Sequence, residues 1–378
     1  MKRKYLWLDA ILDEKSIGSF ESHSPATSFW QHGFVRGIMS CGHSVYVIGT
    51  PSERAWPFGR LLVSSKDVSL PNHIEGRLFG YLNIPGIRGF SQFLVIRSAV
   101  NRFIKDHGLP DYSVTFSCQN SQRDISPMGR VAKYLQSKYE IPWLCIVGDG
   151  LAPLGADHYV IQNWKYFLSN ESPTPKVHLD GGLAEIPSDE LISGASQKLT
   201  KNFMYMGAFT KHGGASLLAR AFTRLTDANV NLFFSGRGEN EELARLADKD
   251  QRIKVLGFLT DTELHHHALD MYAFVNPRLT DWPPNKLNFP SKLLHYFAYA
   301  KPVISTITDG MSPDYLPILL ETDGTEDDLV LALRRCIDMP VDDYNDKCKK
   351  IEKFNIDHTW DALATQLNIW LDEQKKQN

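Results

Sequence analysis

Short apolar runs alternate with amphipathic stretches along most of this chain. The apolar runs are rich in β-branched and aromatic residues, which is typical of buried strands in parallel sheets. They occupy residues 43–50, 112–117, 142–147, 202–206, 230–235, 253–256 and 272–276. The amphipathic stretches place apolar residues at helical spacing and cover residues 28–41, 90–107, 128–139, 215–225 and 239–248. This alternation predicts α/β domains built on parallel sheets.

Three regions follow the pattern less clearly. Residues 4–10 are expected to form a first strand, followed by a polar loop at 13–27. Residues 51–89 are rich in Gly, Pro and aromatic residues, which predicts one strand at 61–64 within an irregular excursion. Residues 184–201 are polar and weakly patterned, and this indicates a hinge region between two domains.

A loop that turns into a helix stands out at residues 288–304, NFPSKLLHYFAYAKPVI. Pro290 is tolerated there because the first N–H groups of a helix have no intrahelical partners. Those amides, together with the helix dipole, predict an anion site at Phe289 to Lys292. The helix is expected to bury Leu293, Leu294, Phe297 and Ala298. With the glycine-rich loop at 207–214, GAFTKHGG, this arrangement suits a diphosphate.

Composition limits the class of protein. The 378 residues are enough for two domains, and 43% hydrophobic with 22% charged residues describes a globular chain. Acidic residues interrupt the apolar run near the start, so neither a signal peptide nor a membrane-spanning helix is expected. The five cysteines have no metal-ligand spacing and are expected to be free thiols in a reducing cytoplasm.

Charge is distributed unevenly. The net charge of -3 argues against nucleic-acid binding. Residues 1–180 contain 19 Lys and Arg against 15 Asp and Glu, whereas the remainder contains 22 against 29. A basic group in the first half comprises Arg77, Arg88, Arg97, Arg102 and Lys105. It fits either an ordinary solvated helix face or a peripheral contact with a membrane or an anionic acceptor.

Four segments carry a family resemblance. They are MYMGAFTKHGG, VNLFFSGRGE, IKVLGFLTDTELHHHALDMYAFVNPR and FPSKLLHYFAYAKPVIST, in that order. In this order they resemble the nucleotide-sugar-binding domain of GT-B glycosyltransferases, in particular glycosyltransferase family 4. The resemblance implies an α/β protein with GT-B architecture, in which two Rossmann-like domains face a central cleft. We expect an acceptor domain at 1–184 and a donor domain at 185–356, with the helical segment 357–378 packing back on the first domain.

The resemblance also implies which residues bind the donor. Lys211 would reach phosphate from the glycine loop, and Lys292 would complete the clamp with the backbone at Pro290 and Ser291. Arg237 would approach the nucleotide, Arg278 the diphosphate or sugar, and Phe258 the base. The remaining donor-site candidates are Gly18, Gly207, Gly213, Gly214, Asn288 and His295.

One departure from the family concerns its pair of glutamates, which would fall at Leu287 and His295. A histidine can still hydrogen-bond a ribose hydroxyl through either ring nitrogen. Asn288, with Asp281, Asn285 and Lys286 in the same loop, could contact the sugar hydroxyls. The departure leaves the identity of the donor, and activity itself, open.

Asp149 is the catalytic candidate of the first half, beside Lys211 and Lys292 in the second. It follows a buried strand within Gly-Asp-Gly, where it could serve as a base or contact the acceptor, or could cap the next turn. Asp157 and His158 are further candidates. His265 to His267 are consecutive on a helix and cannot converge on one ion, so no metal site is expected.

The expected function is transfer of a hexose from a UDP- or GDP-linked sugar to a glycan or lipid-linked acceptor. The resemblance implies retention of configuration, no cofactor and no metal, in polysaccharide or glycoconjugate biosynthesis. The protein would act in the cytoplasm or at the inner face of the membrane. Two alternatives stay open: a sugar-nucleotide epimerase or hydrolase on the same fold, and a catalytically silent donor-binding or scaffold protein.

Overall fold

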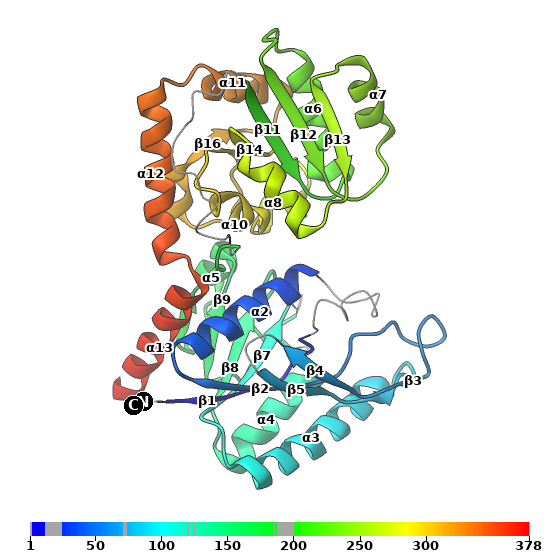
Figure 1. The fold of residues 1–378 in the computed structure, drawn as a ribbon. Helices are drawn as coiled ribbons and strands as arrows, with labels where there is room; N and C mark the ends of the chain where they lie inside the picture. The colour runs from blue at the N-terminus through cyan, green and yellow to red at the C-terminus, as the bar shows by residue number, and fades with distance from the viewer. Residues whose placement is uncertain are drawn as a thin grey trace. The chain divides into compact units, whose positions relative to one another are not determined.

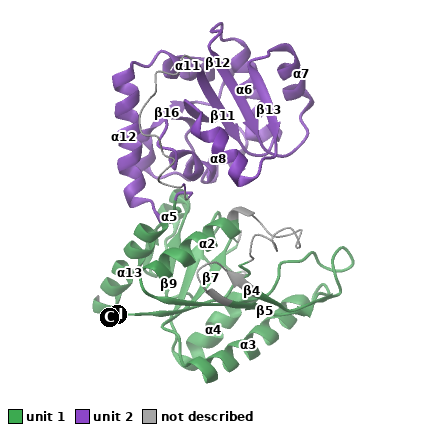
Figure 2. Cartoon of the chain, in the orientation of Figure 1, with its two compact units in different colours: residues 1–182, 360–378 green, residues 183–359 purple. Residues whose placement is uncertain are grey.

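The computed structural model describes residues 2–11, 25–70, 74–118, 121–123, 125–184, 186 and 200–377. The chain forms two compact units (Figure 2). Unit 1 comprises Met1–Gly182 and Trp360–Asn378, and unit 2 comprises Leu183–Thr359. The borders expected after residues 184 and 356 lie two and three residues from these.

Unit 1 contains a mainly parallel sheet (Figure 1). Its strand order among the described residues is β10-β9-β8-β7-β1-β2-β5-β4, and only the β4–β5 pair is antiparallel. The strands are β1 (Lys4–Trp7), β2 (Ser44–Gly49), β4 (Lys66–Leu70), β5 (Ile74–Leu78), β7 (Tyr112–Ser117), β8 (Trp143–Val147), β9 (His158–Ile161) and β10 (Lys176–His178). A separate two-stranded ribbon pairs β3 (Leu62–Val63) with β6 (Tyr81–Leu82).

Successive residues of a strand point to opposite faces of the sheet. In this sheet the side chains on both faces are apolar, so helices cover both faces. Tyr5 and Trp7 of β1 face one core, to which α2 and α13 contribute, and Leu6 and Leu8 face the other, to which α3 and α4 contribute. The helices are α2 (Pro25–Ser40), α3 (Arg88–His107), α4 (Pro127–Tyr139), α5 (Trp164–Ser169) and α13 (Trp360–Gln377).

The return of the chain through α13 completes unit 1. The Trp360 ring occupies a site where a side chain at Gly33 or Gly182 would lie 2.0 or 2.3 Å from it. Arg3 bonds to Asn368 and Asp372 of α13, and the Tyr5 hydroxyl donates to Asn368 at 2.8 Å. Helix α13 is therefore an integral layer of unit 1.

Two expectations for unit 1 are wrong. The first strand ends at Trp7 instead of Ala10, and the region 51–89 contains β3 to β6 where one strand was expected. β4 and β5 read KDVSL and IEGRL, and β4 lies at the edge of the sheet. Edge strands tolerate polar residues on exposed positions, so they lack the apolar pattern of central strands.

Unit 2 has a parallel sheet with the order β13-β12-β11-β14-β15-β16. Its strands are β11 (Lys201–Met206), β12 (Val230–Ser235), β13 (Ile253–Gly257), β14 (Ala273–Asn276), β15 (Val303–Thr306) and β16 (Leu319–Thr322). Its helices are α6 (Ala215–Thr223), α7 (Glu241–Lys249), α8 (Asp261–Leu269), α9 (Pro283–Leu287), α10 (Lys292–Phe297), α11 (Glu326–Ile337) and α12 (Val341–Asp357), with 3-10 turns η3 (Lys211–Gly213) and η4 (Pro313–Ile318).

Two apolar cores hold unit 2 together. One face of the sheet packs with α6 and α11, and the other with α8, α10 and α12. The four residues expected to face inward from the helix at 292 are all buried: Leu293, Leu294, Phe297 and Ala298. Helix α8 begins with a capping box that Thr260 and Glu263 form.

Candidate functional site

The unit 2 sheet has a topological switch point between β11 and β14. From β11 the chain proceeds outward through β12 and β13, and then returns to β14 on the other side of β11. Open α/β sheets bind ligands at the carboxyl ends of the strands that flank such a point. The glycine loop 207–214 follows β11, and Pro277 and Arg278 follow β14.

Glycines are required in this loop because other groups approach its backbone closely. A Cβ added to Gly207 would lie 2.8 Å from the Lys292 Nζ atom. Gly214 has a left-handed φ of 80°, and a Cβ there would lie 1.8 Å from the carbonyl oxygen of Pro277. The loop therefore joins the carboxyl ends of β11 and β14 and brings Lys292 against its first residue.

Lys292 lies at this switch point in an unusual electrostatic state. Its Nζ atom is 4.1 Å from the centre of the Tyr205 ring. Burial lowers the pKa of Lys292 to about 7, and the positive charge of Arg278 contributes in the same direction. Within the described part of the chain no carboxylate pairs with Lys292. An anion would stabilise the charged form of a half-buried lysine that lies beside an arginine.

Tyr296 fixes this arrangement, and the sequence-based search missed it. Its hydroxyl oxygen accepts a hydrogen bond from the Met206 N–H at 2.9 Å, at the end of β11. The same hydroxyl lies 3.4 Å from the Val275 carbonyl oxygen of β14. Tyr296 follows Lys292 by four residues on α10, and that helical spacing is the signal that could have identified it.

The helix start at 289–292 differs from the expectation. Helix α10 has six residues, and Ser291 precedes it without a side-chain cap. The Ser291 N–H donates to the Phe289 carbonyl at 3.0 Å, so this amide is used within the turn. Phe289 and Pro290 are buried. The Ser291 amide is therefore not free for an anion, and the cation that this segment offers is the Lys292 side chain.

Arg237 and Phe258 lie together on the β12–β13 side of the same sheet edge. The guanidinium carbon of Arg237 is 3.8 Å from the centre of the Phe258 ring. Phe258 is 62% exposed although it is a large apolar residue. The Phe209 N–H donates to the Arg237 carbonyl at 2.8 Å, which links this pair to the glycine loop. An exposed aromatic face beside a cation is suited to stacking with a planar ring.

The loop before α10 has a structural role at Asn285. This residue is buried, and its Nδ2 atom donates to the carbonyl oxygens of His212 at 2.7 Å and Leu279 at 2.9 Å. The interpretation of Asn285 as a sugar contact is therefore wrong, because its amide is used inside the fold. The ring of His212 stacks on Trp282 with centres 4.0 Å apart and strengthens the same link.

Lys211, Asn288 and His295 keep their status as predictions. Lys211 is exposed on η3, beside Gly213. The backbone of Asn288 bonds to Pro284 and Thr308, and its side chain is part-buried. Burial lowers the pKa of His295, with the charge of Asp261 at the start of α8 acting in the opposite direction.

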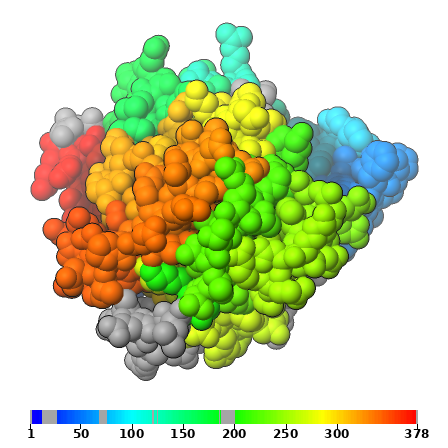
Figure 3. Space-filling model, turned by 90° about the horizontal axis from the view of Figure 1, so that it is seen from above, coloured from blue at the N-terminus to red at the C-terminus, as the bar shows by residue number. Residues whose placement is uncertain are grey.

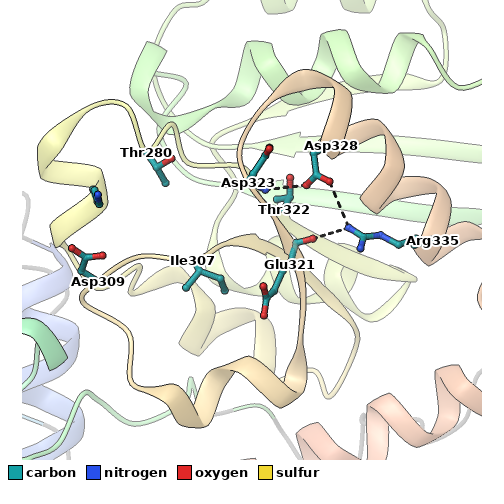
Figure 4. Close-up of a pocket in the computed structure, with 9 residues that line it drawn as sticks. Thr280, Ile307, Asp309, Glu321, Thr322, Asp323, Asp328 and Arg335 are labelled. Atoms are coloured by element: carbon teal, nitrogen blue, oxygen red, sulfur yellow. Dashed lines mark hydrogen bonds and ion pairs between the residues drawn. The ribbon is translucent and has the colours of Figure 1, made fainter.

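A separate cavity of about 500 Å³ lies at the β15–β16 side of unit 2 (Figure 4). Its acidic lining consists of Asp309, Glu321, Asp323 and Asp328, and its basic lining of Lys286 and Arg335. Arg335 donates to the Glu321 carbonyl at 2.9 Å and lies 4.0 Å from the Asp328 carboxylate. This cavity has the wrong charge for a diphosphate.

Unit 1 also has a switch point, between β1 and β7. Asp9 follows β1 there, and the sequence-based search did not consider it for the site. Burial raises the pKa of Asp9 to about 6, although the Ala10 N–H and the Gln31 side chain hydrogen-bond to the carboxylate. A Cβ on Gly49 of β2 would lie 2.1 Å from the Asp9 carbonyl oxygen, which shows how closely the strands enclose this residue.

Other polar groups share this carboxyl edge. Asp149 follows β8, is exposed, and accepts a hydrogen bond from Asn163 Nδ2 at 2.9 Å. Buried polar atoms with no partner among the described residues include Ser117 Oγ and Gln162 Nε2, at the ends of β7 and β9. Burial raises the pKa of Cys118 to about 11, with the charge of Asp149 adding to the effect, so its thiol is neutral. Unsatisfied buried groups at a strand end indicate a place for a polar ligand.

Asp157 and His158 do not belong to this edge. The Asp157 carboxylate accepts hydrogen bonds from the Trp143 N–H at 2.7 Å and from Gln136 at 2.9 Å. His158 is the first residue of β9. Both therefore lie at the amino ends of the strands, and the interpretation of them as site residues is wrong. Gly18 lies outside the described residues.

The described residues contain neither a metal-ligand cluster nor a membrane-spanning helix. His265 contacts the Tyr299 ring, and His267 contacts Phe233. The described residues contain no group of three His, Cys, Asp or Glu side chains placed to hold one metal ion. All five cysteines are free. No helix in the described ranges combines the length and apolar character needed to cross a bilayer.

Comparison with known proteins places this geometry in context. Residues 200–338 match the family model described as "Glycosyl transferases group 1". A comparison with curated protein sequences gives no match.

Solved structures resemble the whole chain at low sequence identity. Sucrose-phosphate synthase from Thermosynechococcus elongatus has a TM-score of 0.64 at 12% identity, with 100% of both chains covered. An α,α-trehalose-phosphate synthase (UDP-forming) from Burkholderia vietnamiensis has a TM-score of 0.66 at 9% identity, again with 100% of both chains covered. Anabaena HepE in complex with UDP and glucose has a TM-score of 0.63 at 13% identity, covering 98% of this chain and 100% of that one.

The fold class predicted from sequence is therefore confirmed. Residues 200–338 match the glycosyl transferases group 1 model, and the chain as a whole has the GT-B fold.

Proposed function

We propose that this protein is a glycosyltransferase that moves a hexose from a UDP-linked donor to a glycan or lipid-linked acceptor. The observation that carries the proposal is the convergence of Lys292, Arg278 and the glycine loop at the unit 2 switch point. Lys292 lies against Gly207, and Arg278 contributes to the lowered pKa of Lys292. Two cations beside close-approach glycines are suited to a diphosphate.

The same charges fit the chemistry of sugar transfer. As the bond between the anomeric carbon and the diphosphate oxygen breaks, negative charge develops on the leaving diphosphate. Positive groups placed at that oxygen stabilise the transition state more than the ground state. Lys292 and Arg278 would supply this charge from within the sheet edge, and Lys211 would supply more from the exposed loop.

The acceptor hydroxyl would attack on the face that the diphosphate leaves, so configuration is retained. A bond forms from the acceptor oxygen to the anomeric carbon, and the hydroxyl proton passes to the departing phosphate oxygen. Asp9 and Asp149 of unit 1, with Ser117 and Gln162 beside them, would orient the acceptor. The thiols are free, which favours a cytoplasmic setting in polysaccharide or glycoconjugate synthesis.

The choice of UDP is supported by two similar structures. HepE was solved with UDP and glucose, and the trehalose-phosphate synthase is described as UDP-forming. The exposed Phe258 ring, with Arg237 against it, would take the planar base. His295 would contact the ribose from α10.

Calorimetric titration of the full chain with UDP, GDP and ADP tests the proposal. We expect UDP to bind most tightly, and Lys211→Ala to weaken it by about tenfold or more, as expected for loss of one charge-assisted hydrogen bond. Lys254→Ala, at an exposed lysine on β13, is the matched control and should bind like the wild type. Absence of binding to all three nucleotides in folded protein would refute the donor site.

A second candidate, a silent donor-binding protein, is favoured by Leu287 and His295 at the positions of the family's glutamates. It would bind UDP without turnover. A sugar-nucleotide hydrolase or epimerase would instead consume a UDP-sugar in the absence of any acceptor. Following UDP-glucose by chromatography, with and without a panel of glycan and lipid-linked acceptors, separates the three: acceptor-dependent release of UDP supports the transferase.

A further inference from the structure

An exposed apolar patch lies on unit 1, at a distance in sequence from the residues described above. Of the eighteen large apolar side chains that are exposed among the described residues, seven lie between residues 56 and 94. These seven define the Phe58 patch: Trp56, Phe58, Leu61, Leu62, Ile87, Phe90 and Leu94. Phe58 is 85% exposed, Leu62 68% and Phe90 58%. Exposed apolar side chains gathered in this way mark an interaction surface.

Hydrogen bonds show that the patch is continuous. Asn83 is fully buried and joins the loop before β3 to the segment before α3. Its N–H donates to the Leu61 carbonyl at 2.9 Å, and its carbonyl accepts from the Trp56 N–H at 3.1 Å. Leu62 pairs with Leu82, whose N–H donates to Ser91 Oγ on the first turn of α3 at 3.0 Å. The loop and the helix start therefore form one surface, seen as blue and light-blue atoms at one edge of Figure 3.

The loop presents its apolar side chains from a tight turn. The Phe58 and Gly59 N–H groups both donate to the Ala55 carbonyl, at 3.0 and 3.2 Å. Asn83 Nδ2 donates to the carbonyls of Arg54 at 2.6 Å and Arg60 at 2.9 Å, which closes the loop on both sides. Backbone bonds thus hold the loop closed while Phe58 points away from the core, so its exposure is a feature of the fold.

Positive charge continues the patch along α3. Helix α3 contains Arg88, Arg97, Arg102 and Lys105 and one acidic residue, Asp106 near its end. The buried face of α3 carries Gln92, Ile96, Ala99, Val100 and Phe103. Residues 87, 90, 94, 97 and 105 fall on the opposite face by helical spacing. One side of this helix therefore changes from apolar to basic, and Arg97 and Lys105 are exposed.

We propose that the Phe58 patch docks unit 1 onto the surface of a bilayer that contains anionic lipids. The apolar side chains would enter the boundary between headgroups and acyl chains. Arg97, Arg102 and Lys105 would contact the anionic headgroups. Charge complementarity selects this occupant, since a second copy of the chain would bring the same four basic residues against each other.

Vesicle co-sedimentation of the full chain tests the proposal without any nucleotide or sugar. We expect the protein to sediment with vesicles of phosphatidylcholine mixed with phosphatidylglycerol, and much less with phosphatidylcholine alone. Because the electrostatic part is screened by salt, binding should weaken as ionic strength rises.

Two double variants probe the two halves of the surface. Phe58→Ser with Leu62→Ser, and Arg97→Glu with Lys105→Glu, should each weaken vesicle binding by about tenfold or more. Leu168→Ser with Ile369→Ser is the matched control, because these unit 1 residues are similarly exposed on α5 and α13. The control should bind as the wild type does, and near-UV circular dichroism checks that each variant is folded.

Several results would overturn the proposal. The wild type could fail to sediment with anionic vesicles, or it could bind both lipid compositions equally. Both double variants could also bind vesicles as well as the wild type does. The wild type could instead fail to bind vesicles and dimerise as its concentration rises. If Phe58→Ser with Leu62→Ser then abolished dimerisation, the patch would be assigned to contact with a second copy of the chain. Since no donor is present, failure here leaves the proposed transferase activity untouched.

Discussion

The carboxyl edges of the two sheets share one geometry and carry opposite charge. In unit 2 the switch point holds Lys292, whose pKa is lowered to about 7 by burial. In unit 1 the switch point holds Asp9, whose pKa is raised to about 6 by burial. Each sheet therefore places one ionisable group where the fold disfavours its charged form.

This contrast distinguishes ionisable groups that stabilise the fold from ionisable groups that could bind a ligand. A group held in an unfavourable charge state costs folding stability, so such groups are candidates for a functional role. The positive edge is suited to the diphosphate of a donor. The negative edge, with buried Ser117 and Gln162 atoms beside it, is suited to the hydroxyl of an acceptor.

The largest expected effect comes from Lys292→Met, which keeps the aliphatic volume and removes the charge. We expect UDP-dependent transfer to fall by about 100-fold, in the range found when a preorganised charge donor is removed. The midpoint of thermal unfolding should stay the same or rise, because a buried ammonium is lost. Steady-state kinetics and calorimetry of the same sample measure both. Equal loss of stability and activity would mean that Lys292 is structural.

Asp9→Asn should have the next largest effect, on the acceptor side. We expect acceptor-dependent kcat/KM to fall by about thirtyfold, as expected for loss of a charge-assisted hydrogen bond that orients the acceptor hydroxyl, while UDP affinity is unchanged. In the wild type the rate should rise as pH passes through about 6, because Asp9 ionises there, and the variant should lack this limb.

The stability of the Asp9 variant gives an independent check. A raised folded pKa means that ionisation costs stability as pH increases from the unfolded value towards about 6, and the full cost applies above it. Asp9→Asn should therefore be more stable than the wild type at neutral pH and no more stable near pH 4. Denaturant unfolding at the two pH values measures this. A destabilised variant at neutral pH would contradict the burial account.

The effect of pH on UDP affinity should be smaller than the two effects above. We expect affinity to change by about tenfold between about pH 6 and about pH 8, because one proton is linked to binding. Lys292 has a lowered folded pKa, and a bound diphosphate would raise it. Affinity should thus decrease as pH rises above about 7, with proton uptake on binding. Calorimetry in buffers of different ionisation enthalpy detects that proton. Lys292→Met should show no such dependence; if it keeps the dependence, another group titrates.

Phe258→Ala should have the smallest effect. We expect UDP affinity to fall by about fivefold, which corresponds to the loss of one aromatic stacking contact. The loss should be the same for uridine and UDP, since the ring would contact the base and not the phosphates. Val255→Ala on β13 is an exposed apolar control and should bind normally. If the variant lost affinity for UDP but not for uridine, the base would have to bind elsewhere.

Local pattern was enough to predict much of the fold. The strands at 112–117 and 230–235 occur with the predicted bounds, because central parallel strands are apolar on both faces. The short strands around residues 62–82 could not be predicted in this way. β3 and β6 are only two residues long and pair with each other, and β4 is an edge strand, so these strands leave little local pattern.

The site was predictable only where chemistry resides in local motifs. The glycine loop and Lys292 could be proposed from sequence, because close backbone approach and a helix start have local signatures. Asp9 was missed because its burial arises from Gly49 and Gln31, on other elements. Asn285 was misinterpreted for the converse reason, since nothing local shows that its amide bonds to His212.

The return of α13 to unit 1 has a consequence for synthesis. Unit 2 is one uninterrupted segment, Leu183–Thr359, whereas unit 1 needs Trp360–Asn378 for one of its layers. On the ribosome, therefore, the second unit has emerged in full while the first still lacks the side chains that contact Gly33 and Gly182. Until α13 has been synthesised, part of the apolar surface of unit 1 stays exposed. Chaperones would be needed most at this stage.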